Sequence, residues 1–80
     1  MRDALKRYIA HELLGRRDAL GLADDDDLLG SGVDSVGMMS LVLFIEERWQ
    51  LPVPPEDVTI ENFQTVERIE SYLRGRGAGE

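Results

Sequence analysis

The sequence predicts an all-α domain, a small four-helix bundle in which three main helices and one short third helix accompany a long first loop. Apolar residues recur every three or four positions in three separate segments, and glycines and prolines divide these segments. No stretch alternates apolar and polar residues as a half-buried strand does. A chain of 80 residues, 42% of them hydrophobic, suffices for one core and not for two. We expect a single domain over residues 1–74 and a flexible, glycine-rich tail over residues 75–80.

The first helix is predicted from Arg2 to Leu14. Leu5, Ile9 and Leu13 repeat at four-residue steps, which is typical of an amphipathic helix. Gly15 follows and can adopt the left-handed conformation that ends many helices.

The long loop runs from Gly15 to Val33 and shows no sustained period. We interpret its acidic run, Asp24–Asp27, as a solvated segment that attracts basic partners. A calcium loop starting at Asp24 would need an oxygen ligand at its fifth position and a bidentate acid at its twelfth, where this chain has leucine and serine. We expect the leucines of the loop to attach it to the core: Leu20, Leu22, Leu28 and Leu29.

The second helix should begin at Asp34–Ser35, since either side chain can accept a backbone N–H in the first turn. It should end at about Trp49 or Gln50, before Pro52. Several apolar residues lie outside any single stripe of this helix, which indicates burial on most sides or a face kept for a partner. They are Val36, Met38, Leu41, Leu43 and Phe44.

Beyond a proline-rich turn, one short helical turn is predicted within Glu56–Phe63, anchored by Val58, Ile60 and Phe63. The last helix should start near Thr65, acting as N-cap, and reach Leu73 or Arg74 before Gly75. The stripes of all the helices predict one core. Its members are Leu5, Ile9, Leu13, Met39, Val42, Ile45, Trp49, Phe63, Val66, Ile69 and Leu73.

Composition excludes several classes of function. With no cysteine, the chain has no disulfide, catalytic thiol or thiolate metal site. Nine basic against 16 acidic residues, a net charge of −7, argue against nucleic-acid binding and favour basic protein partners. The N-terminal segment lacks a targeting pattern, and the apolar stretch from Val36 to Ile45 is too short to span a bilayer, so we expect a cytoplasmic protein without membrane association.

A hydrolytic triad is not expected. His11 is the only histidine, and Val33 stands where a nucleophile elbow around Ser35 would need glycine. We interpret His11 as a surface residue and predict no catalytic residues and no metal site.

Ser35 is the most informative polar residue. A serine at the start of a helix, after a glycine-containing loop, is exposed, and the positive helix end favours a phosphate there. Ser35 could instead serve only as the helix cap. Asp34 can cap equally well, which leaves the serine hydroxyl free for a phosphodiester.

The segment Gly32-Val33-Asp34-Ser35-Val36 resembles the Gly-x-Asp-Ser-Leu/Met signature of the acyl carrier protein family, which includes peptidyl and aminoacyl carrier domains. The resemblance extends over nearly the whole chain, because the order of the predicted helices also agrees. Further matches are Leu28-Leu29, Glu46-Glu47, Leu51-Pro52-Val53 and Phe63-Gln64-Thr65-Val66.

This resemblance implies that Ser35 carries 4′-phosphopantetheine, moved onto its hydroxyl from coenzyme A by a phosphopantetheinyl transferase. The thiol of that arm then holds an acyl or aminoacyl group as a thioester, so the sulfur missing from the sequence comes from the cofactor. The protein is then a carrier and not an enzyme. Further implied partners are an acyl- or aminoacyl-loading ligase or transferase and synthase or tailoring enzymes, and we expect the carrier to be a monomer.

The resemblance also implies docking of partners on the acidic and apolar face of the second helix. The candidates are Asp34, Val36, Met39, Leu43, Glu46 and Glu47. Fatty-acid-synthesis carriers usually have acidic residues early in this helix, where this chain has Gly37 to Ser40, and Val36 replaces the typical leucine or methionine.

We therefore predict a discrete acyl carrier of a polyketide or other specialised pathway. The alternative is a peptidyl or aminoacyl carrier of nonribosomal-peptide-type biosynthesis. A fatty-acid-synthesis carrier and a cofactor-free helical adaptor are the remaining hypotheses.

Overall fold

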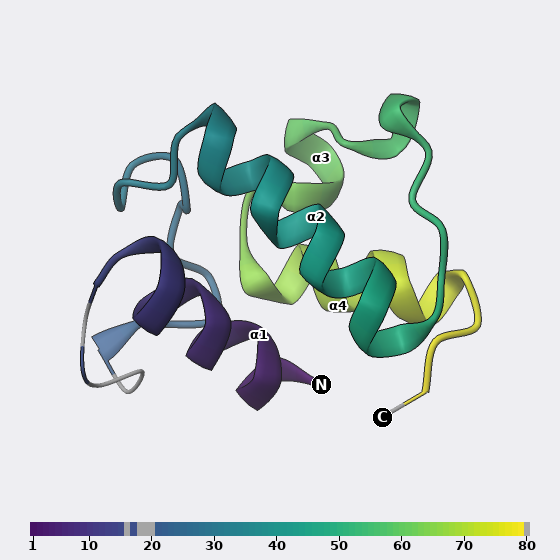
Figure 1. The fold of residues 1–80 in the computed structure, drawn as a ribbon, viewed down its shortest axis with the longest axis horizontal. Coiled ribbons are helices and arrows are strands. Elements are labelled where there is room, and N and C mark those ends of the chain that lie inside the picture. Colours follow the sequence, from purple (N-terminus) through teal and green to yellow (C-terminus); the bar gives the residue numbers. More distant parts are fainter. Residues whose placement is uncertain (16, 18–20, 80) are drawn as a thin grey trace.

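The computed structural model describes residues 1–15, 17 and 21–79, and within these it contains helices and no strand. Figure 1 shows α2 crossing the middle of the molecule, with α1 on one side and α3 on the other, and α4 running behind it. The elements are α1 (Arg2–Tyr8), the π-helical turn η1 (Ile9–Leu13), α2 (Ser35–Trp49), the 3₁₀ turn η3 (Pro55–Asp57), α3 (Ile60–Phe63) and α4 (Val66–Gly75). The predicted all-α class is confirmed.

The first predicted helix is present, but its last turn is wider than an α-helix. The Leu14 amide donates to the Ile9 carbonyl at 2.9 Å, five residues back, which is the π-helical pattern. Gly15 then takes a φ of +66°, as a terminating glycine does. Leu5 and Ile9 are buried, and Leu13 is partly buried against them.

The long loop is fastened to the junction between α3 and α4. The Leu28 amide donates to the Gln64 carbonyl at 2.9 Å, and the Glu67 amide donates to the Asp24 carbonyl at 3.0 Å. Leu22 and Leu28 are buried as predicted. Leu29 is exposed, so its predicted attachment to the core is wrong, and the prediction for Leu20 lies outside the described residues.

The acidic run is not uniformly solvated, and its first member was predicted wrongly. Asp24 is half-buried and forms ion pairs with Arg2 and Lys6 of α1, while Arg2 Nε also donates to Glu70 Oε1 of α4 at 2.7 Å. The Lys6 ammonium holds the pKa of Asp24 below its usual range, and Arg2 does the same for the pKa of Glu70. These charges therefore join the first helix, the loop and the last helix.

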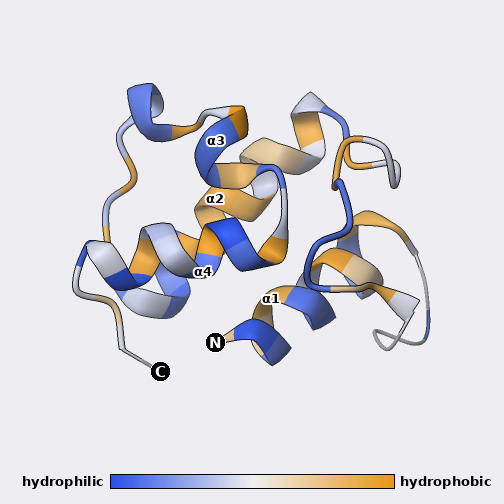
Figure 2. Ribbon diagram, turned by 180° about the vertical axis from the view of Figure 1, so that it is seen from behind, coloured by the Kyte–Doolittle hydropathy of each residue, from blue (hydrophilic) through white to orange (hydrophobic). Residues whose placement is uncertain are grey.

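Helix α2 turns a different face to the core than predicted. Leu41 and Ile45 are fully buried, whereas Met39 is 69% exposed, so its placement in the core is wrong. At about 3.6 residues per turn, Leu41 and Ile45 lie on the same face of the helix, one turn apart. Met39 lies roughly a third of a turn around the helix from Ile45, and nearly half a turn from Leu41. Figure 2 shows α2 as apolar along most of its length, which is why the sequence did not single out one stripe. Val42 and Trp49 are partly buried against the core.

The C-terminal third begins with two short helical segments where one was predicted. The turn η3 and the helix α3 are separated by Val58 and Thr59, and the Thr59 hydroxyl accepts the Asn62 amide at 3.3 Å. Phe63 is buried, but Ile60 is exposed, so the anchoring role predicted for Ile60 is wrong.

Helix α4 begins as predicted. The Thr65 hydroxyl accepts the Arg68 amide at 3.1 Å, and Val66, Ile69 and Leu73 form its buried stripe. The helix extends to Gly75, and the Ala78 amide donates to the Leu73 carbonyl at 2.9 Å. The flexibility expected for residues 75–80 stays a prediction.

These elements close one core, to which every helix and the long loop contribute. Within the described part of the chain, no helix combines the length and the hydropathy that crossing a membrane requires. The buried core consists of Leu5, Ile9, Leu22, Leu28, Val33, Leu41, Ile45, Val53, Phe63, Val66, Ile69 and Leu73.

Candidate functional site

Ser35 is the first residue of α2, and its neighbour performs the capping. Asp34 has an extended backbone, and its Oδ1 accepts the Gly37 amide at 2.8 Å, as an N-cap side chain does. Ser35 is exposed, and its hydroxyl makes no hydrogen bond to any residue that the structure describes. The prediction that Asp34 can cap the helix and leave the serine free is confirmed.

The loop before Ser35 is held in a defined path. The Val33 amide donates to the Leu28 carbonyl at 3.0 Å, and both side chains are buried. Gly32 has a φ of +115°, a conformation that side chains rarely adopt, and a Cβ there would lie 3.4 Å from Leu14 Cδ2. The exposed hydroxyl therefore follows a loop that is anchored in the core.

The electrostatic setting of Ser35 suits a phosphate group. A helix leaves its first N–H groups without intrahelical partners, and its positive end favours an anion. The first turn of α2 itself contains no acidic residue, and the Asp34 carboxylate that directly precedes Ser35 is engaged with the Gly37 amide. An anionic group on the Ser35 oxygen would thus lie at the favourable end of a 15-residue helix.

The surroundings of His11 do not form a catalytic arrangement with Ser35. A ring nitrogen of His11 lies 2.9 Å from the Arg17 carbonyl oxygen, and the side chain is exposed, as predicted. His11 lines a shallow depression between α1 and the second half of α2, beside Phe44 and Arg48. Among the described residues, no three histidines or carboxylates gather where they could hold a metal ion.

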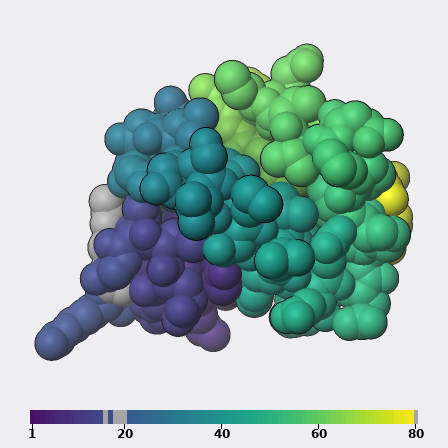
Figure 3. All heavy atoms as spheres, turned by 45° about the horizontal axis from the view of Figure 1, so that its top comes forward, coloured from purple at the N-terminus to yellow at the C-terminus, as the bar shows by residue number. Residues whose placement is uncertain are grey.

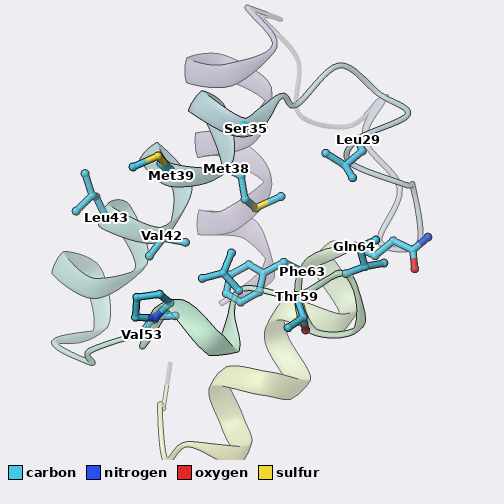
Figure 4. A pocket seen from close by; sticks show the side chains of 13 residues that line it. Leu29, Ser35, Met38, Met39, Val42, Leu43, Val53, Thr59, Phe63 and Gln64 are labelled. Carbon is cyan, nitrogen blue, oxygen red and sulfur yellow. The ribbon is translucent and has the colours of Figure 1, made fainter.

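An apolar groove of about 480 Å³ opens next to Ser35, between α2 and the segment that carries η3 and α3. We call it the α2–α3 groove. Figure 4 shows Met38 and Val42 pointing from α2 toward Phe63, with Met39 and Leu43 at the outer edge. Its lining residues are Leu29, Ser35, Met38, Met39, Val42, Leu43, Val53, Pro55, Val58, Thr59, Ile60, Phe63 and Gln64.

Sequence reasoning missed this groove. Its walls come from residues between 29 and 64, and only folding brings them together. The one sequence signal was the excess of apolar residues on the second helix, which indicated a partner face without showing a hollow.

Two of the three apolar docking candidates, Met39 and Leu43, line the α2–α3 groove, and Val36 lies three residues before Met39 on the same helix. Val36, Met39 and Leu43 are exposed, and the apolar surface continues to Leu29 and Ile60, which sequence reasoning did not include. Figure 3 shows α2 and residues 51–64 side by side on one face of the molecule. Their role in docking stays a prediction.

The two acidic candidates late in α2 differ in their surroundings. Glu46 is half-buried, and its Oε2 accepts the Val53 amide at 2.8 Å, which holds the chain after α2 against the helix. Glu47 is exposed, and its side chain makes no ion pair with the described residues. Glu47 is therefore available to a partner, while Glu46 has a structural task.

Known proteins resemble this chain over most of its length. The family model described as "Phosphopantetheine attachment site" matches residues 3–73. An acyl carrier protein of Clostridium perfringens is 33% identical over 75 residues, which cover 91% of this chain and 92% of that protein. Aminoacyl carrier protein 1 of Bradyrhizobium diazoefficiens is 37% identical over 46 residues, or 58% of this chain and 51% of that one.

Solved structures agree with the fold. One chain in the crystal structure of the Bradyrhizobium japonicum glycine:[carrier protein] ligase, complexed with its cognate carrier protein and an analogue of glycyl adenylate, matches with a TM-score of 0.75 and 26% identity. The match covers 92% of this chain and 96% of that chain. The complex of the same ligase with glycylated carrier protein matches with a TM-score of 0.67 and 27% identity, over 88% of this chain and 89% of that one.

Proposed function

The chain belongs to the phosphopantetheine-attachment family of acyl carrier proteins, and from this we propose that Ser35 is the residue that bears its prosthetic group. Proteins of this family are carriers and not enzymes, and the group that they carry is 4′-phosphopantetheine. When bound, it supplies a thiol on a long arm, which holds the cargo as a thioester.

The observation that supports the proposal is that Asp34, and not Ser35, caps α2. Asp34 satisfies the Gly37 amide, so the Ser35 hydroxyl is exposed and free to react. On modification, the Ser35 oxygen forms a bond to phosphorus while the phosphoanhydride bond of coenzyme A breaks. The nucleotide leaves with the electron pair of that bond, and the serine proton passes to a base of the transferase.

The pathway that we propose is polyketide or other specialised biosynthesis. In support, the first turn of α2 has no acidic residue, and three exposed residues that follow Ser35 in this helix are apolar: Val36, Met39 and Leu43. The capping Asp34 before Ser35 is the acidic neighbour that remains. Such a face fits partners that bury apolar surface rather than partners that read a dense acidic patch.

A second candidate is an aminoacyl carrier. It is favoured by the likeness to a chain solved in complex with a glycine:[carrier protein] ligase, at a TM-score of 0.75. Both candidates require a loading enzyme that delivers an activated acid to the thiol of the arm.

The attachment site is tested by intact-protein mass measurement after incubation with coenzyme A, magnesium and several promiscuous phosphopantetheinyl transferases. We expect one addition on the wild type and on Ser71→Ala, which alters an exposed serine of α4, and none on Ser35→Ala. An addition that persists in Ser35→Ala overturns the assignment of Ser35. No addition to folded wild-type protein, with transferases proven active on another carrier, favours the cofactor-free adaptor.

The cargo is tested on the modified protein. Acyl-activating and aminoacyl-activating ligases are offered in parallel, and the mass of the thioester product is measured. Loading by acyl ligases alone supports the first pathway, whereas loading by aminoacyl ligases alone supports the second.

A further inference from the structure

One wall of the α2–α3 groove has little backbone support of its own. Pro55 and Val58 line the groove from η3 and the residue that follows it. The turn is closed locally, by the Asp57 amide donating to Pro54 at 2.9 Å and the Val58 amide donating to Pro55 at 3.1 Å. Packing of Val53 and Val58 against the core, together with contacts from other elements, therefore fixes the position of this wall relative to the rest of the fold.

A cluster at the end of α4 provides such contacts, and we call it the Arg76 clamp. Arg76 Nη1 donates to Asp57 Oδ2 at 3.0 Å and to the Tyr72 hydroxyl at 2.9 Å, while Nη2 donates to the Pro52 carbonyl at 3.2 Å. The Tyr72 hydroxyl donates to the same Asp57 oxygen at 2.6 Å. The guanidinium also lies 5.8 Å from the centroid of the Tyr72 ring. The clamp thus consists of Arg76, Tyr72, Asp57 and the Pro52 carbonyl.

The clamp contacts both short helical segments that border the groove, η3 and α3. Asp57 immediately precedes Val58 in the wall, and its carbonyl accepts Asn62 Nδ2 of α3 at 2.9 Å. The Tyr72 ring lies 5.5 Å, between centroids, from the ring of Phe63, which lines the groove. A change in the clamp is therefore transmitted to η3 and α3 together.

The geometry of the clamp is better suited to holding η3 in place than to stabilising the whole fold. The side chains of Arg76 and Asp57 are each about one third exposed, and ion pairs at such sites contribute little to global stability. The planar guanidinium, however, offers a fixed fork of donors that can hold an oxygen of η3 and a carbonyl of the preceding turn at once. Arg76 Nη1 and the Tyr72 hydroxyl both bind Asp57, and Arg76 Nη2 binds the Pro52 carbonyl, so three donors hold the segment from residue 52 to residue 57.

We propose that Arg76 is a positioning residue that, together with Tyr72 and Asp57, fixes the η3 wall and so sets the capacity of the α2–α3 groove for apolar groups. The proposal goes beyond the attachment of a prosthetic group, because the groove and the clamp belong to the unmodified chain. Its tests use unmodified protein, so they are independent of the fate of Ser35.

The first test is amide hydrogen exchange followed by NMR on the full chain. Arg76→Met keeps the length of the side chain and removes its donors, so the Asp57 and Val58 amides should exchange about tenfold faster. The Ile45 amide in α2 should change less than about twofold. Arg74→Met, on the same helix end and paired with Glu70 instead, is the matched control and should leave all three rates unchanged.

Equal acceleration at Asp57, Val58 and Ile45 would mean that Arg76 merely stabilises the whole fold and would overturn the proposal. No acceleration would overturn it as well. Arg76→Lys keeps the charge but loses the fork, so it should restore protection at Asp57 only in part. If lysine restored full protection of the Asp57 amide, the positive charge alone would hold the wall, and the role proposed for the guanidinium of Arg76 would be overturned.

The second test measures groove capacity with N-phenyl-1-naphthylamine, a neutral apolar probe whose fluorescence rises on burial. Losing a preorganised wall should weaken its binding at least fivefold in Arg76→Met, while Arg74→Met binds as the wild type does. Equal affinities for the two variants, or no binding by the wild type, would overturn the link between clamp and groove.

Discussion

The Asp34 carboxylate accepts the backbone N–H of Gly37 at 2.8 Å, two residues after Ser35. Capping of α2 and presentation of the serine are thereby assigned to neighbouring side chains. Mutation can separate the two roles, because removal of the Asp34 cap should leave the Ser35 hydroxyl in place, and removal of the hydroxyl should leave the cap intact.

Asp34→Ala should lower the free energy of unfolding by about 1 kcal/mol, since it leaves a first-turn amide without its partner. Asp34→Asn retains a side-chain oxygen and should stay close to the wild type. Ser35→Ala should change stability by less than about 0.5 kcal/mol, because its hydroxyl bonds to none of the described residues. Urea unfolding measures all three, and equal stability of the alanine and asparagine variants at 34 contradicts the cap.

Leu41→Ala should destabilise the protein by about 2–5 kcal/mol, because Leu41 is completely buried and its loss leaves a cavity. Met39→Ala, two residues away on the exposed face, should cost less than about 0.5 kcal/mol. Thermal and urea unfolding check both. A large loss of stability in Met39→Ala with a small loss in Leu41→Ala would instead support the buried face that the sequence suggested, with Met39 in the core.

Glu47→Lys should slow loading of the carrier by a basic partner several-fold at low ionic strength, with a smaller effect at high salt. Glu67→Lys, at an exposed position of α4, makes the same change of net charge outside α2, and it is the matched control. Initial rates of transferase or ligase reactions measure the effect. Equal slowing by both variants would indicate a response to net charge and not to a docking contact.

Glu46 is unsuitable for that docking experiment. Its carboxylate accepts the Val53 amide, so charge reversal would disturb the turn after α2 as well as any interface. Glu46→Ala should itself cost about 1 kcal/mol of stability in urea unfolding, whereas Glu47→Ala should be close to neutral.

Asp24→Asn should lower stability at neutral pH and lose this effect in acid. The hydrogen bond from Lys6 lowers the pKa of Asp24 in the folded protein, whereas the unfolded value is about 4. The ionised carboxylate therefore adds stability above about pH 4, and the addition disappears as the pH falls through the lower, folded pKa. The difference in unfolding midpoint between wild type and variant should shrink below about pH 4.

Asp25→Asn is the control for this pH series, because Asp25 is exposed and forms no ion pair with the described residues. It should show no comparable difference at neutral pH. A constant gap between wild type and Asp24→Asn from neutral to strongly acidic pH would show that the carboxylate contributes through packing instead of charge.

Helix ends were predictable because their signals are local. Asp34 and Thr65 accept amides three residues ahead, and Gly15 adopts its left-handed conformation without help from distant residues. The serine at the start of α2 could be singled out for the same reason, since a cap residue and a free hydroxyl stand side by side in the sequence.

Long-range features could not be predicted. Asp24 reads as one of four consecutive aspartates, and only folding shows that it meets Arg2 and Lys6. Arg76 lies in a glycine-rich end that resembles a loose tail, yet it contacts the carbonyl of Pro52, 24 residues earlier. The buried face of α2 was uncertain because apolar residues surround the helix, so the choice between Met39 and Leu41 depends on what packs against it.

The two backbone bonds that tie Leu28 to Gln64 and Asp24 to Glu67 also set an order for biosynthesis. Ser35 is synthesised about 30 residues before these two partners of the loop. Until the start of α4 emerges, the loop lacks its anchoring contacts, and contacts between such distant residues form late in folding. The anchored loop that leads to Ser35 therefore cannot be complete until the last quarter of the chain is available to fold.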